Sequence, residues 1–209
     1  MTQTMHPTSA TGAQPKRGVG WLAVAGGLAL IFAGQKAFYP ASFGPFIFLA
    51  TLVLYLGMIP IASWMANSLA ARITPRGTGL VRAAQILGII GALAAAATAL
   101  LAFQRWLPAV PAQIAETSSL GVIGLWLLIA NVQAFRARLF NRVLALFGVL
   151  IGVGWLLATA IMWAELSLGS LGGLVATLEN LRQYGGILAQ LFYLIWALWL
   201  GIWLLVRKR

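Results

Sequence analysis

Few residues of this chain have side chains that could do chemistry. Its 209 residues include three acids, one histidine (His6) and no cysteine. Without cysteine the chain can form no disulfide, thiolate metal site or iron–sulfur cluster. A single histidine in a polar tail supplies neither a haem ligand pair nor a histidine metal site. The sequence also has no P-loop, G-x-S-x-G, H-E-x-x-H or glycine-rich dinucleotide turn. We therefore expect a protein that is not an enzyme and that uses no cofactor or metal.

The strongest candidates for ligand binding are Lys36, Glu165 and Gln190. They lie near the outer ends of three predicted membrane spans, at about equal depth. A lysine beside a carboxylate can orient a head group or pass on a proton. We therefore predict a small polar pocket there; the alternative is that these side chains simply reach the membrane surface.

Three amides, Asn67, Asn131 and Gln133, lie near the inner ends of the second and fourth predicted spans. They could bind a ligand, but polar residues at these positions commonly cap helix ends. We expect capping.

The elements that position these residues are apolar segments. Hydrophobic residues make up 61% of the chain and charged residues 8%, whereas about 25% of a soluble domain is charged. Because about 20 apolar residues span a bilayer, the chain is an integral membrane protein. The predicted spans are 21–34, 46–66, 84–103, 119–134, 143–164 and 186–206. The expected fold class is all-α, a polytopic bundle of six transmembrane helices, although the short fourth segment could instead be re-entrant.

The charges predict the orientation of this bundle. With the N-terminus inside, eleven basic residues and no acid fall on the inner side: Lys16, Arg17, Arg72, Arg76, Arg82, Arg136, Arg138, Arg142, Arg207, Lys208 and Arg209. The outer loops balance Lys36, Arg105 and Arg182 against Glu116, Glu165 and Glu179. Positive-inside bias therefore predicts that both termini are cytoplasmic. Basic residues spread over four short segments indicate contact with anionic inner-leaflet lipids and not with nucleic acid.

We expect one domain, residues 19–209, behind a flexible cytoplasmic tail, residues 1–18. The first apolar run either anchors the chain or is the core of a cleaved signal peptide. In the last outer loop, leucines recur every three or four residues. This spacing predicts a short amphipathic helix on the outer surface near 168–184, which ends at Gly185-Gly186.

Small residues indicate where the helices pack closely. The fifth predicted span contains Gly148-x-x-x-Gly152, and the third contains Gly88-x-x-x-Ala92. In lipid, helices associate where small residues let their backbones approach. We expect these residues to pack inside the bundle; a dimer interface is the alternative.

A short pattern, A-N-x-x-A-x-R, occurs at 66–72 and again at 130–136, a register of 64 residues. It could mark an internal repeat of a helical hairpin. Chance is the rival explanation, because the positive-inside rule favours arginine at inner helix ends.

The C-terminal third contains Asn141-Arg142 before a glycine-rich span, then Gly185-Gly186 and an aromatic run from Tyr193 to Trp203 before a basic end. In these features the chain resembles bacterial six-helix membrane proteins of unknown function. The resemblance implies a helical bundle in the bacterial cytoplasmic membrane, and it implies no activity. The tryptophans of the run should face lipid or neighbouring helices.

Two functions fit these expectations. The first is a non-enzymatic membrane component that acts through helix packing, lipids, a protein partner or a second copy of itself. The alternative is a small uncoupled transporter or lipid-handling protein that uses the outer pocket. Ion coupling is disfavoured, because no charged residue falls at the centre of a predicted span.

Overall fold

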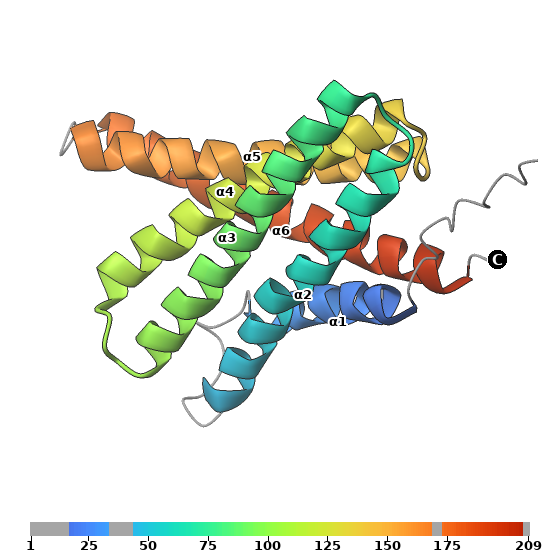
Figure 1. Cartoon of the computed structure of the whole chain (residues 1–209). Helices are drawn as coiled ribbons and strands as arrows, with labels where there is room; N and C mark the ends of the chain where they lie inside the picture. Colours follow the sequence, from blue (N-terminus) through green and yellow to red (C-terminus); the bar gives the residue numbers. More distant parts are fainter. Residues whose placement is uncertain (1–16, 34–43, 169–172, 207–209) are drawn as a thin grey trace, which may run out of the picture.

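The computed structural model describes residues 17–33, 44–168 and 173–206. These residues form six α-helices (Figure 1) and contain no strand. The helices are α1 (Arg17–Ala33), α2 (Gly44–Ala70), α3 (Pro75–Phe103), α4 (Ala109–Arg136), α5 (Arg142–Leu168) and α6 (Gly173–Val206). The predicted all-α fold class is confirmed.

Five of the helices, α2 to α6, are long and apolar enough to cross a membrane. The first helix, α1, is also apolar but has only 17 residues, or about 25 Å at 1.5 Å per residue. The chain therefore has the architecture of a multi-pass membrane protein. Residues 1–16 of the predicted tail lie outside the described residues, and Arg17 and Gly18 already belong to α1.

The fourth helix is longer than the sequence pattern suggested. It begins at Ala109, ten residues before the predicted span, and continues to Arg136. At 28 residues it is long enough to cross a bilayer, so the re-entrant alternative is wrong. Glu116 consequently lies inside a helix and not in the outer loop to which the sequence pattern assigned it.

The third helix shows why the inner helix ends extend beyond the apolar segments. Thr74 has an extended backbone and accepts a hydrogen bond from the Gly77 amide at 3.5 Å. Pro75 occupies the first helical position, where its missing amide proton costs nothing. The helix therefore starts at a cap, nine residues before the predicted span, and includes Arg76 and Arg82 in its first turns.

Each helix packs against the next along the chain, and α6 returns to pack against α1. The six helices therefore close a ring. The turns at 71–74 and 137–141, the start of α1 and the end of α6 lie toward one end (Figure 1), which we call the basic end. The turn at 104–108, the end of α5 and the start of α6 lie at the other, which we call the acidic end, because Glu116, Glu165 and Glu179 are near it.

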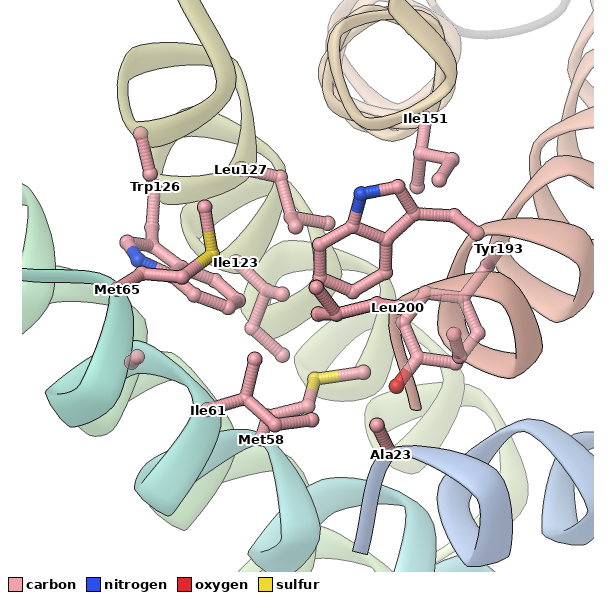
Figure 2. Packing of buried hydrophobic residues seen from close by; sticks show 14 of the residues in the cluster. Ala23, Met58, Ile61, Met65, Ile123, Trp126, Leu127, Ile151, Tyr193 and Leu200 are labelled. Carbon is pink, nitrogen blue, oxygen red and sulfur yellow. The ribbon is translucent and has the colours of Figure 1, made fainter. Parts of the chain in front are cut away.

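The middle of the ring is filled by large side chains. Figure 2 shows Met58 and Met65 of α2, Trp126 of α4 and Tyr193 of α6 pointing into one cluster. The side chains of Trp126, Tyr193 and Trp196 are each at most 2% exposed. The prediction that the tryptophans of α6 face neighbouring helices or lipid therefore holds for Trp196, which is buried inside the bundle.

The last outer segment departs from the predicted arrangement. Residues 173–184 are helical, as the leucine spacing indicated, but they form the first turns of α6. The helix continues through Gly185 and Gly186 without a break. There is therefore no separate surface helix in the described part of 168–184, because a glycine pair inside an apolar helix does not end it when the following turns pack on neighbours.

Candidate functional site

The structure describes two of the three residues of the predicted outer cluster, Glu165 and Gln190, and these two lie apart. Lys36 lies outside the described residues. The carboxylate of Glu165, on α5, forms an ion pair with Arg182 of α6, with 3.3 Å between Nε and Oε2. Gln190 is eight residues beyond Arg182, about 12 Å farther along α6, and it lines a different part of the bundle.

Arg182 is shared between two carboxylates. Its Nη2 also donates to Glu179 at 2.6 Å, one turn earlier on α6. The charges of Glu165 and Glu179 are thus tied to one guanidinium, which clamps the start of α6 to the end of α5. Among the described residues, Glu165 therefore pairs with an arginine, and the predicted pairing with Lys36 stays a prediction.

The remaining acid, Glu116, enters a site that the sequence did not predict. It is half-buried on α4, and its Oε1 accepts a hydrogen bond of 2.7 Å from the hydroxyl of Tyr55 on α2. Tyr55 is 3% exposed. A buried phenol bonded to a carboxylate from another helix forms a polar contact inside an otherwise apolar bundle.

A small pocket lies beside this contact. It has a volume of about 50 Å³ and receives side chains from five helices. Its lining residues are Leu30, Leu54, Tyr55, Glu116, Leu120, Trp155 and Gln190. Because about 10 to 15 Å³ of such space is enough for one water, the small pocket has room for a small polar group.

A larger pocket lies on the other side of Glu116. It has a volume of about 180 Å³ between α2, α3 and α4. It is lined by Gly44, Ile47, Phe48, Thr51, Thr98, Ala99, Ala102, Phe103, Ala112 and Glu116. Its walls are mostly apolar, and its size exceeds that of a roughly 150 Å³ cavity that binds benzene. The large pocket can therefore hold part of a hydrocarbon chain.

Among the residues that the structure describes, Glu116 alone lines both the large and the small pocket. Thr51, in the large pocket, donates its hydroxyl to the Ile47 carbonyl of its own helix at 2.8 Å. In the small pocket, the ring of Trp155 stacks on the ring of Tyr193, with ring centroids 5.5 Å apart. This contact fixes the position of Trp155. Glu116 therefore places a carboxylate between a pocket large enough for part of a hydrocarbon chain and a pocket that fits only a small polar group.

Asn131 lies in the half of the bundle nearer the basic end and is fully buried. Its Nδ2 donates to the Leu127 carbonyl at 2.8 Å, and its Oδ1 accepts from Trp196 Nε1 at 3.3 Å. It lies five residues before the end of α4, so the predicted capping role is wrong for this residue. Asn131 instead links α4 to α6. Asn67 is exposed and Gln133 half-buried.

The small residues named for packing all lie at contacts between helices. A methyl group on Gly148 of α5 would overlap the Asn131 amide. One on Gly152 would lie 2.6 Å from the Gly124 carbonyl of α4, and one on Gly88 of α3 would lie 2.6 Å from Trp126. Ala92 has no exposed surface. These residues therefore contact neighbouring helices of the same chain.

The basic end exposes its arginines. Six of them, Arg72, Arg76, Arg82, Arg136, Arg138 and Arg142, are exposed. Arg138 sits at a positive φ of 49° in the turn between α4 and α5. No group of three histidine, aspartate or glutamate side chains that could hold a metal occurs among the residues described.

Sequence reasoning missed Tyr55 and Glu116 because it began the fourth span too late, at residue 119 and not at Ala109. A usable signal was present, since Pro108 and Pro111 flank Ala109, and proline is typical of the first turn of a helix. Starting the helix there places Glu116 about two turns inside it.

Comparisons of this chain with family models, with curated proteins and with solved structures give no match.

Proposed function

We propose that this protein is a non-enzymatic, lipid-handling component of a membrane, which holds an amphipathic molecule in the two pockets at Glu116. The observation that supports this is the position of one carboxylate between a mostly apolar space of about 180 Å³ and a smaller one of about 50 Å³. A hydrocarbon chain matches the first space and a polar head matches the second. Lipids and other amphiphiles have this composition.

The proposed orientation places the basic end in the cytoplasm, with both termini inside. The exposed arginines of that end support this, because cytoplasmic loops are enriched in lysine and arginine. They would contact anionic inner-leaflet lipids, worth about 1 kcal/mol for each basic residue near the surface. The pockets then face the outer leaflet. We propose the bacterial cytoplasmic membrane as the location, on the resemblance noted from the sequence.

Binding without ion coupling fits the charge distribution. Two of the three acids of the chain, Glu165 and Glu179, pair with Arg182, and the pair with Glu165 holds α5 to α6. We propose retention or uncoupled passage of the amphiphile between the pocket and the outer leaflet. Action on a protein partner or a second copy of the chain is the competing proposal, and nucleic acid is not proposed as a ligand.

The test is to purify the protein in lipid nanodiscs from its native membrane and to identify bound molecules by mass spectrometry. Ala99→Phe places a ring in the large pocket, since Ala99 lines it. Ala97→Phe is the matched control on the same helix, because Ala97 is exposed. We expect a stoichiometric amphiphile with the wild-type chain and with Ala97→Phe, and its loss with Ala99→Phe.

Two outcomes would count against the proposal. Retention of the same amphiphile by Ala99→Phe would place the molecule elsewhere. A stoichiometric protein partner with no retained amphiphile would favour the competing proposal.

A further inference from the structure

The proposed function leaves open which part of an amphiphile the large pocket recognises. Resting on that function, we propose that the ligand is an acyl lipid, an ester of a fatty acid, whose carbonyl oxygen accepts a hydrogen bond from Thr98 in the large pocket. Three features of Thr98 support this role: its unpaired hydroxyl, the apolar walls around it and its depth in the bundle.

Thr98, on α3, is buried but lacks a hydrogen-bond partner. It lines the large pocket and is 8% exposed. Its hydroxyl makes no hydrogen bond with any residue that the structure describes, not even with the carbonyl one turn earlier on its own helix. Thr51, on the α2 wall of the same pocket, does form such a bond, to the Ile47 carbonyl at 2.8 Å. Of these two hydroxyls, only that of Thr98 still has a proton to donate.

The rest of the large pocket explains why this proton matters. The walls around Thr98 are mostly apolar. A buried hydroxyl without an acceptor is costly, so such groups are nearly always paired with protein or with water. Water that enters the pocket would pair with Thr98, and a ligand that displaces this water loses affinity unless it supplies an acceptor. The large pocket therefore suits a chain that carries an acceptor oxygen better than a plain hydrocarbon chain.

The depth of Thr98 indicates which acceptor this is. The 29 residues of α3 extend about 43 Å at 1.5 Å per residue, close to the roughly 40 to 45 Å of a bilayer with its head groups. The hydrocarbon core takes about 30 Å of this thickness, which leaves about 6 Å of each helix end among the head groups. Thr98 is five residues before the end of α3, or about 7 Å from it. It therefore lies at the level where the hydrocarbon begins.

The ester groups of a lipid lie at that level, since they join the chains to the head. A carbonyl oxygen only accepts hydrogen bonds, so it pairs with Thr98 and brings no proton of its own. A ligand hydroxyl would bring a proton that needs a second partner in mostly apolar surroundings. An ester carbonyl is thus the acceptor that fits both the unpaired hydroxyl and its depth.

The experiment compares two lipids that differ in the carbonyl oxygen alone. They are monolauroylglycerol, an ester, and monododecylglycerol, the ether in which a methylene replaces the carbonyl. Each displaces radiolabelled monolauroylglycerol from the purified full-length protein in a neutral detergent. We expect the wild-type chain to bind the ester about fivefold to tenfold more tightly than the ether, the effect of one hydrogen bond.

Thr98→Val keeps the shape of the side chain and removes the hydroxyl. We expect it to bind the ether as the wild-type chain does, and the ester no more tightly than the ether. Thr98→Ser retains the hydroxyl and should keep the preference, which a purely structural role of the methyl group would not allow. The ratio of the two affinities, compared between variants, cancels any difference in how the two lipids partition into detergent.

Thr78→Val is the matched control on the same helix. Thr78 donates to the Thr74 carbonyl at 3.1 Å and is 20 residues before Thr98, about 30 Å along α3. This variant should keep the preference for the ester.

The same ratio of ester to ether affinity in the wild-type chain and in Thr98→Val would overturn the inference. The proposed function would still stand if Ala99→Phe weakens the binding of both lipids. Loss of the preference in Thr98→Ser as well as in Thr98→Val would also overturn the inference, because packing and not the hydroxyl would then be responsible. If the wild-type chain binds neither lipid and Ala99→Phe retains its native amphiphile, both the inference and the proposed function fail.

Discussion

Two buried polar contacts of the bundle, Asn131 with Trp196 and Glu116 with Tyr55, differ in how closely their surroundings are packed. Toward the basic end, the amide of Asn131 has two hydrogen-bond partners, and glycine lets it lie directly against α5. Toward the acidic end, the contact between Tyr55 and Glu116 is flanked by two pockets. Both regions bury polar groups in an apolar bundle.

The difference in packing separates the structural role of Asn131 from the candidate binding role of Glu116. In lipid, a polar side chain that is satisfied by neighbouring helices stabilises one arrangement of those helices. A carboxylate beside empty space does not fill its surroundings and leaves room for a ligand. Asn131 therefore belongs to the scaffold and Glu116 to the candidate site, although both are polar residues on the same helix, α4.

The largest expected loss of stability comes from a substitution at the close contact between α4 and α5. Gly148→Leu places a branched side chain where even a methyl group would overlap Asn131. We expect the free energy of unfolding to fall by about 3 to 5 kcal/mol, the range of severe overpacking with loss of a buried hydrogen-bond network. Thermal unfolding in detergent, followed by near-UV circular dichroism, measures it.

The control for this prediction is Gly186→Leu on α6. A side chain at Gly186 meets no heavy atom within 4 Å, so unfolding should stay near that of the wild-type chain. Equal stability of the two variants would mean that close approach at Gly148 does not hold α5 against α4.

A smaller effect is expected at the hydrogen-bond link between α4 and α6. Asn131→Ala leaves Trp196 Nε1 buried without its partner and opens a cavity against Gly148. We expect a loss of about 1 to 3 kcal/mol in the free energy of unfolding. The exposed Asn67, which occupies the equivalent place in the A-N-x-x-A-x-R pattern, is the matched control. Asn67→Ala should be neutral, and an equal loss at both sites would contradict the structural role assigned to Asn131.

The smallest expected changes in stability come from the same substitution, alanine to valine, made at one position beside the large pocket and at one fully buried position. Ala112→Val adds two methyl groups beside the large pocket, and we expect a gain of about 0.5 to 1 kcal/mol, as is common for cavity filling. Ala92→Val adds the same groups where no surface is exposed, and overpacking should cost about 1 to 3 kcal/mol. Chemical or thermal unfolding of both variants under one set of conditions gives the signs. The same sign for both would show that the two positions do not differ in packing.

Much of the fold follows from composition and periodicity. Six apolar segments gave the all-helical class, and Gly88, Gly148 and Gly152 were assigned to close contacts. The helix ends were less predictable, because α3 and α4 begin directly after Thr74 and Pro108, nine and ten residues before their predicted spans. Apolar length alone does not mark where a helix starts once a cap or a proline supports its first turn.

The candidate site depended on contacts that the sequence does not display. Glu165 and Gln190 were predicted to lie at similar depths. In the structure, Glu165 forms an ion pair with Arg182 at the contact between α5 and α6, whereas Gln190 lines the small pocket. Tyr55 and Glu116 are 61 residues apart in the chain. The predicted equal depth of Glu165 and Gln190 was wrong, because α6 begins well before the predicted span and Gln190 lies about 12 Å along it from Arg182. Which side chains meet depends in addition on the rotation of each helix about its axis.

By itself, the sequence determined that this chain is a bundle of apolar helices without cysteine, because composition and segment length govern transfer into lipid. The tertiary structure alone decided that Asn131 is buried against Trp196, that Glu116 meets Tyr55, and that the space around Glu116 is left unfilled. The physical reason is that packing between helices depends on the shapes of side chains from several segments at once. No single segment contains that information.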